Sequence, residues 1–150
     1  MFKDCLLSNY KIPTLNINTI KNITKDSDVI LWNGPLGLIE NTKFSKGSVD
    51  IAKYLSKSIH KNFNVGRWGG EEFIVLMKHT NIDQAKEIMD ELRINTSKES
   101  FSHGNINQSF TISIGISQWY DDTDDFESLF IKADKALYRA KKAGRNTVEY

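Results

Sequence analysis

The stretch RWGGEEFIVLMK (67–78) combines a turn signal with a strongly apolar run. Its two consecutive glycines, Gly69 and Gly70, permit the positive φ angles of a tight hairpin turn. β-Prone residues precede the turn in NFNVGRW (62–68) and follow it in FIVLMK (73–78), so the sequence predicts an antiparallel hairpin. Because the second arm is apolar on both alternating faces, we expect it to be an interior strand of a helix-covered sheet.

Helical periods appear on both sides of this hairpin. Apolar residues at three-to-four spacing predict helices over 48–60, 82–94 and 126–142. Asn81 followed by Gln84 forms a capping pair for the second helix, and Gly144 ends the third. The polar segment 95–108 has no consistent period, which predicts a loop or a loop that carries an extra hairpin.

Strand patterns fill the remaining positions. SFTISIGIS (109–117) alternates strictly between apolar and small or polar residues, and is the clearest strand of the chain. NTVEY (146–150) is expected to be an edge strand. Before the first helix, an apolar run predicts a strand over 28–32, interrupted by Gly34 and Pro35, after a weak helix that ends near Lys25.

Composition indicates one ordinary globular domain. The chain has 150 residues, of which 39% are hydrophobic and 26% charged, enough for a single core. A net charge of +1 argues against general binding to nucleic acid or to anionic membrane. The lone Cys5 and the lack of any long apolar run predict a cytoplasmic protein without an internal disulfide or a membrane span.

Three blocks together point to a known family. A lone GGEE is more often a solvated turn, but here RWGGEEF (67–73), SFTISIGIS and ADKALYRAKKAGRN (133–146) follow one another in a specific order. In that order and spacing, residues 48–150 resemble the GGDEF domain of the diguanylate cyclase family. The resemblance implies an α/β (α+β) fold similar to the palm of nucleotide cyclases. This fold has a central mixed sheet with an antiparallel GGEEF hairpin, flanked by helices.

The resemblance also implies an activity. Members of this family condense two GTP molecules into cyclic di-GMP, a bacterial signalling nucleotide, and each of two facing domains contributes one GTP. A homodimer and Mg²⁺ or Mn²⁺ would therefore be required. Paired ions stabilise the attacking and leaving oxygens of such a reaction, which is why carboxylates cluster at a turn that the nucleotide can approach.

Six residues match the motif positions of the family. By resemblance, Glu71 ligates metal, and Glu72 is a second ligand or a proton acceptor. Lys141 and Arg145, four positions apart, match residues that contact phosphates. The remaining two, which leave room for the nucleotide, are Gly69 and Gly70. A simpler reading holds for Lys142, which we expect to lie on the solvated face of the last helix.

The chain departs from the family pattern before the hairpin. A complete member has a strand that ends in an Asp-x-Asp metal site, then a helix whose asparagine, with a later aspartate, reads guanine. Here the strand VILW places Asn33 where a carboxylate is expected, and a neutral amide is a poorer Mg²⁺ ligand. Three nearby carboxylates could replace it as a metal ligand: Asp28, Glu40 and Asp50. Asp28, however, stands at the wrong end of the strand. The product-inhibition motif Arg-x-x-Asp is replaced by residues 60–63.

The front of the chain resembles another family. Residues 12–56, and WNGPLGLIE (32–40) followed by FSKG above all, are similar to part of the C-terminal domain of phosphoglycerate kinase. That resemblance would put Asn33 near phosphate and Glu40 on ribose hydroxyls. Kinase activity is not expected, because the rest of that machinery is absent from the chain. We therefore interpret 1–150 as a single domain with an atypical front segment (1–47) and a GGDEF core (48–150).

Three functions stay open at this point. The first is a diguanylate-cyclase-like domain that binds GTP but is catalytically impaired. The second is a non-catalytic module that binds GTP or a protein partner. The third is a natural or artificial fusion fragment without activity.

Overall fold

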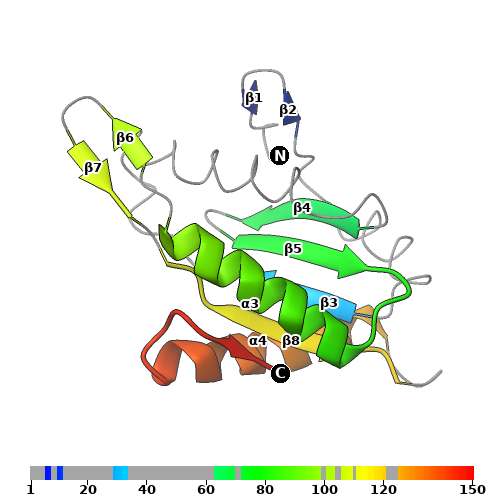
Figure 1. Ribbon diagram of the computed structural model, residues 1–150. Helices are drawn as coiled ribbons and strands as arrows, with labels where there is room; N and C mark the ends of the chain where they lie inside the picture. The colour runs from blue at the N-terminus through cyan, green and yellow to red at the C-terminus, as the bar shows by residue number, and fades with distance from the viewer. Residues whose placement is uncertain are drawn as a thin grey trace.

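The structure, a computed structural model, describes residues 6–7, 10–11, 29–33, 63–69, 72–98, 101–103, 106–109, 111–120 and 125–150. Their main feature is a five-stranded sheet with a helix on each face (Figure 1). The strand order is β4 (Phe63–Gly69), β5 (Glu72–Met77), β3 (Val29–Asn33), β8 (Ile114–Gln118) and β9 (Val148–Glu149). Only β8 and β9 pair in parallel, so the sheet is mixed, as predicted.

The predicted hairpin is confirmed. β4 and β5 pair antiparallel from Phe63 opposite Met77 to Gly69 opposite Glu72, with a register shift between Arg67 and Gly69. β5 has neighbours on both sides, and its residues 73–77 are all buried. Apolarity on both faces of β5 follows from this interior position, since each face lies under a helix.

The two helices divide the core into two layers. Alternating residues of β5 and β8 pack against α3 (Ile82–Lys98) on one face and against α4 (Phe126–Lys142) on the other. The α3 layer contains Phe73, Val75, Met77, Ala85, Met89, Leu92, Ile112, Ile114 and Ile116. The α4 layer contains Ile74, Leu76, Phe126, Leu129, Ala133 and Leu137.

Both helices begin with a reciprocal cap. At α3, the Gln84 backbone N–H donates to Asn81 Oδ1 (2.9 Å) and the Asn81 N–H donates to Gln84 Oε1 (3.1 Å), which confirms the predicted pair. At α4, Asp125 and Ser128 exchange the corresponding bonds at 2.7 and 3.1 Å. Each cap satisfies backbone donors that have no partner within the helix.

The polar segment after residue 94 differs from its predicted loop. α3 continues to Lys98, and Thr96 in this extension is buried. The Thr96 hydroxyl donates to the Leu92 carbonyl (2.8 Å) and the Ser97 hydroxyl to the Ile94 carbonyl (2.7 Å). These bonds satisfy polar side chains within the helix. The extra hairpin exists: β6 (Phe101–His103) pairs with β7 (Ile106–Gln108).

The strand predicted over 109–117 is shorter at its start. β8 begins at Ile114, where it first has partners on both sides, Asn33 of β3 and Val148 of β9. β9 is an edge strand, as predicted. The predicted strand at 28–32 is confirmed as β3, displaced by one residue.

Little of the front segment is described. β1 (Leu6–Leu7) and β2 (Tyr10–Lys11) form a separate two-stranded ladder. The helices predicted over 48–60 and before Lys25 lie outside the described residues. Within the described ranges, none of the helices has the length and apolarity that crossing a bilayer requires.

Candidate functional site

Three strand ends meet at one end of the sheet. β5 begins at Glu72, and its next residue, Phe73, pairs with Asn33, the last residue of β3. Asn33 also pairs with Ile114, the first residue of β8. The start of β5 and the end of β3 therefore lie side by side, with Asn33 as the last residue of β3. That Asn33 stands where the family has a metal-binding carboxylate stays a prediction.

The C-terminal end of α4 covers the same end of the sheet. The Ser117 hydroxyl donates to the Leu129 carbonyl at 2.8 Å, near the start of the helix. Gly115, earlier on β8, lies directly against Ala133 and Leu137. Later residues of α4 thus contact earlier residues of β8, so α4 runs antiparallel to β8. The last turn of α4 therefore points towards the start of β8 and the end of β3.

Glu72, the first residue of β5, brings a carboxylate to this end of the sheet. Its side chain shares the α4 face of β5 with Ile74 and is half-buried. Burial raises the pKa of Glu72 above the ordinary value of 4.5, because it penalises the charged form. The positive charge of Lys141 lowers this pKa, and the negative charge of Asp134 raises it further. The fold thus places the hairpin carboxylate within electrostatic reach of Lys141.

An aromatic cluster connects the hairpin to α4. The ring of Trp68, one residue before the glycine pair, lies 5.0 Å from the Phe130 ring and 6.2 Å from the Phe126 ring, measured between centroids. Tilted contacts at these distances are favourable for aromatic pairs. They stabilise the packing of β4 against the helix that carries Lys141.

Arg145 lies in the turn between α4 and β9. The turn contains three consecutive positive φ angles, 107° at Gly144, 65° at Arg145 and 48° at Asn146. The Arg145 N–H donates to the Ala140 carbonyl at 3.0 Å, which closes the helix end. Arg145 is exposed at the same helix end as Lys141.

The structure describes four of the six predicted site residues. The charge of Lys141 acts on the pKa of Glu72, Gly69 ends β4 opposite Glu72, and Arg145 follows the helix end. Glu71 and Gly70 lie outside the described residues. Sequence reasoning missed Asp134, although its spacing of seven from Lys141 puts both on one helix face.

The donor set fits a divalent ion that arrives with a nucleotide. Glu72 offers a half-buried carboxylate, and Glu71 precedes it in the chain. Within the part of the chain that the structure describes, no group of three or more His, Cys, Asp or Glu residues could hold a metal by itself. Mg²⁺ commonly takes one or two carboxylates and completes its shell with substrate phosphates and water.

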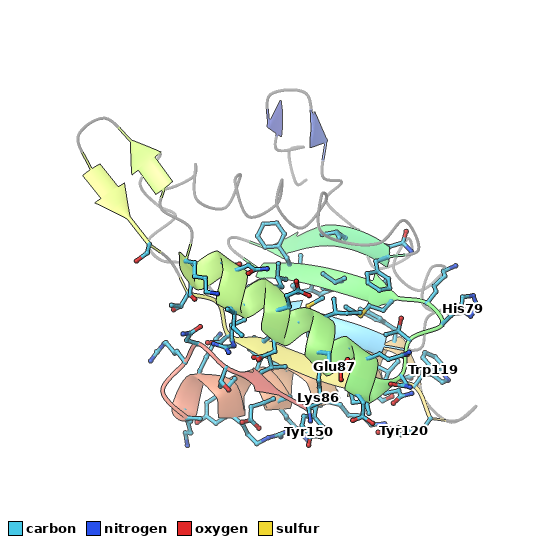
Figure 2. All side chains as sticks on the ribbon, in the orientation of Figure 1. His79, Lys86, Glu87, Trp119, Tyr120 and Tyr150 are labelled. Carbon is cyan, nitrogen blue, oxygen red and sulfur yellow. The ribbon has the colours of Figure 1, made fainter. Side chains whose placement is uncertain are left out.

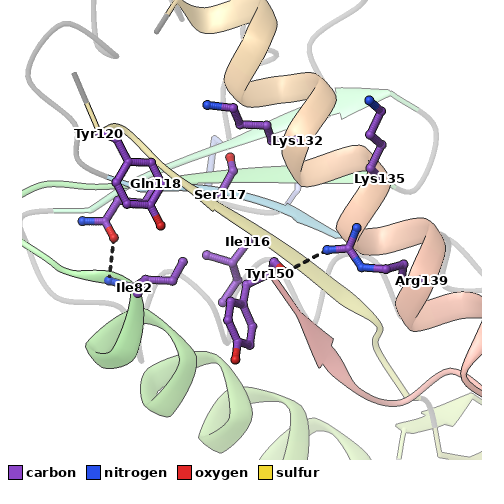
Figure 3. A pocket seen from close by; sticks show the side chains of 9 residues that line it. All are labelled: Ile82, Ile116, Ser117, Gln118, Tyr120, Lys132, Lys135, Arg139 and Tyr150. Carbon is purple, nitrogen blue, oxygen red and sulfur yellow. Dashed lines mark hydrogen bonds between the residues drawn. The ribbon is translucent and has the colours of Figure 1, made fainter. Parts of the chain in front are cut away.

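A cavity elsewhere on the domain is separate from this site. It has a volume of about 260 Å³ and lies between the start of α3, the end of β8 and the middle of α4 (Figure 3). Arg139 at its rim donates to the Tyr150 backbone oxygen at 2.8 Å. The Tyr150 ring lies 3.6 Å below Lys86 Nζ of α3 (Figure 2). None of the predicted site residues lines this cavity.

Comparison with known proteins identifies the family. Residues 49–147 match the sequence profile of the family described as "Diguanylate cyclase, GGDEF domain". The chain belongs to the GGDEF domain family. A similar curated relative is the diguanylate cyclase DgcM of Escherichia coli K12, 38% identical over 98 residues, which are 65% of this chain and 23% of the relative. Diguanylate cyclase A of Treponema denticola is 33% identical over 99 residues, 66% of this chain and 27% of the relative.

Solved GGDEF domains share the fold. The GGDEF domain of DgcB from Caulobacter crescentus, in complex with c-di-GMP, superposes with a TM-score of 0.79 at 17% identity. That superposition covers 99% of this chain and 95% of the other. The active GGEEF domain of a diguanylate cyclase from Vibrio cholerae gives a TM-score of 0.72 at 22% identity and covers 82% of each chain. The chain spans only about a quarter of the length of the two curated relatives, 23% of DgcM and 27% of diguanylate cyclase A.

Proposed function

We propose that this GGDEF domain binds GTP with Mg²⁺ or Mn²⁺ where the hairpin turn meets the end of α4, and that its cyclase activity is impaired. The observation that carries the proposal is the half-buried Glu72 carboxylate within reach of the Lys141 charge. A carboxylate for a metal beside a cation for phosphate is what a metal–nucleotide complex needs. A cytoplasmic setting that supplies GTP belongs to the same proposal.

Each motif residue has a role in this proposal. Glu71 and Glu72 hold the ion, while Gly69 and Gly70 leave space for the nucleotide. Lys141 and Arg145 bind phosphate oxygens and offset their charge. When bound, the metal neutralises phosphate charge and favours attack at phosphorus.

The proposed reaction needs two chains. The 3′-hydroxyl of one GTP attacks the α-phosphorus of the other, a phosphodiester bond forms, and pyrophosphate leaves. The second condensation closes cyclic di-GMP in the same way. Because each domain holds one GTP, we infer that a homodimer is the active form.

The impairment follows from the residues at the end of β3. Its last residue is Asn33, and an amide is a weaker Mg²⁺ ligand than a carboxylate. Asp28, Glu40 and Asp50, the alternative carboxylates, lie outside the described residues. The front segment, which we interpret as a fragment similar to phosphoglycerate kinase, would then supply a strand to the sheet without supplying kinase chemistry.

Thermal denaturation with GTP and Mg²⁺ tests the proposal. A ligand at ten times its dissociation constant stabilises the native state by about 1.4 kcal/mol, which raises the Tm of a domain of this size by roughly 4 °C. We expect this shift for the wild-type chain and its loss in Glu71→Ala. Glu91→Ala, which removes an exposed carboxylate on α3, is the matched control and should keep the shift. No shift at millimolar GTP would reject the proposal.

A non-catalytic interaction module is the second candidate. It is favoured by two large apolar side chains exposed on α4, Ile131 at 50% and Tyr138 at 58%. A precedent for partner binding is the diguanylate cyclase SiaD of Pseudomonas aeruginosa, solved with its activator SiaC, which matches this chain with a TM-score of 0.72 at 23% identity. Partner binding that is independent of GTP would favour this candidate. A fusion fragment without activity would bind neither GTP nor a protein partner.

A further inference from the structure

The turn that carries Arg145 has an unusual backbone. Arg145 and Asn146 have φ angles of 65° and 48°, in the left-handed region, immediately after Gly144. Left-handed backbone costs roughly 1–2 kcal/mol for an ordinary residue with a Cβ, such as arginine, and less for asparagine. Two such residues in succession persist only when surrounding contacts hold them.

Three contacts hold this turn. The Asn146 N–H donates to the Ser113 hydroxyl at 3.1 Å, next to the start of β8. The Ile114 N–H donates to the Thr147 carbonyl at 3.0 Å, which starts the pairing of β8 with β9. The third contact comes from α3, on the opposite face of the sheet, through the side chain of Arg93.

Arg93 reaches Asn146 with two hydrogen bonds. Its Nη1 donates to the Asn146 carbonyl at 3.2 Å and to Asn146 Oδ1 at 3.3 Å. On its other edge, Arg93 Nε pairs with Asp90 Oδ1 at 2.7 Å. The Arg93 side chain is only 18% exposed and that of Asp90 is 49% exposed, so these bonds are partly shielded from water.

The pairing with Asp90 decides what Arg93 can do. A guanidinium that is neutralised by a carboxylate and committed to a backbone carbonyl is poorly suited to capture a phosphate itself. It is well suited to fix the conformation of Asn146. Because Arg145 directly precedes Asn146, this also fixes the direction in which the Arg145 side chain leaves the backbone.

We propose that Arg93 is a positioning residue for phosphate binding, which acts through Asn146 by holding Arg145 in its left-handed conformation. The inference rests on the proposed function, in which Arg145 contacts a GTP phosphate. Without Arg93, the turn can relax to a conformation that presents the Arg145 side chain elsewhere. Misplacement of one charge-assisted contact weakens binding by about tenfold.

A double-mutant cycle tests the proposal. The affinity of the full chain for GTP with Mg²⁺ is measured by calorimetry in wild type, Arg93→Ala, Arg145→Ala and the double variant. We expect each single variant to bind about tenfold more weakly, and the double variant to bind no more weakly than Arg145→Ala alone. Arg93→Lys, which keeps the charge and one donor, should recover part of the affinity.

The controls separate positioning from general stability. Arg139→Ala also removes a guanidinium that donates to a backbone oxygen, at 2.8 Å, but in another place, and should leave GTP affinity unchanged. Melting without ligand reports the fold of each variant. Unchanged affinity in Arg93→Ala, or losses that add in the double variant, would overturn the positioning role alone. Unchanged affinity in Arg145→Ala would instead overturn both this inference and the phosphate role on which it rests.

Discussion

At the scale of single residues, Glu72 has a cost as well as a proposed use. Its carboxylate is half-buried next to one cation and one further anion, and the balance raises its pKa. A group with a raised carboxyl pKa holds more protons in the folded state than in the unfolded state. The free energy of unfolding therefore falls as the pH rises from 4.5 through the folded pKa.

Glu72→Gln should consequently stabilise the ligand-free domain at neutral pH. We expect a higher Tm than that of wild type at pH 7, because the buried charge is removed, and a smaller gap as the pH falls towards 4.5. The same variant should lose the Tm shift with GTP and Mg²⁺. Scanning calorimetry across the pH range measures both effects.

Glu91→Gln is the comparison for this experiment, since it changes the same charge on an exposed side chain of α3. A Glu72→Gln variant that melts below wild type at pH 7 would contradict this reading, and would mean that attraction to Lys141 outweighs the cost of burial.

At the scale of elements, the contact of β8 with α4 positions the site. A Cβ added at Gly115 would lie 2.2 Å from the Ala133 carbonyl oxygen and 2.4 Å from the Leu137 nitrogen. Both are backbone atoms of α4, which cannot turn aside as a flexible side chain can. The glycine therefore lets the helix lie close to the sheet, and this approach brings the helix end to Glu72.

Gly115→Ala should displace α4 from β8. We expect a loss of about 3 kcal/mol in stability, at the upper end for overpacking, and a Tm lower by roughly 10 °C. Gly144→Ala is a useful comparison, because its φ of 107° strains the backbone while a Cβ there would meet nothing within 4 Å. That variant should cost about 1 kcal/mol. Thermal melts of the two variants compare these costs, and equal losses would contradict the steric explanation.

At the scale of the whole molecule, the proposed catalysis depends on what β3 contributes. It is the middle strand of the sheet, and it ends beside the hairpin with Asn33. Asn33→Asp would place a carboxylate at this strand end. We expect at least about tenfold more cyclic di-GMP than from wild type, or roughly 1.4 kcal/mol in activation free energy, measured by chromatography after incubation with GTP and Mg²⁺ or Mn²⁺.

Two further measurements complete this prediction. Asn64→Asp on β4, opposite Leu76 and at the other end of the hairpin from Gly69 and Glu72, adds the same charge and should give no gain. Because two chains would each hold one GTP, the initial rate should rise with the second power of chain concentration. An Asn33→Asp variant that forms no more product than wild type would mean that the missing carboxylate is not what limits the domain.

The hairpin, the strand at β3, the α4 boundaries and the Asn81 cap could be predicted from the sequence, because each depends on a local period or on a short-range hydrogen bond. The extent of α3 beyond residue 94 was missed, since Thr96 is buried in the folded domain and this burial has no signal in a polar run. The resemblance of the motifs to the GGDEF family also predicts Glu72, Lys141 and Arg145 as site residues.

Which of these residues act on one another depends on tertiary packing. Glu72 and Lys141 are far apart in the chain, and the charge of Lys141 reaches Glu72 because α4 runs antiparallel to β8 over Gly115. The effect of Asp134 on the pKa of Glu72 and the bonds of Arg93 to Asn146 join residues that are distant in the chain. Their positions depend on how the two helices pack on opposite faces of one sheet, and packing is a property of the folded chain as a whole.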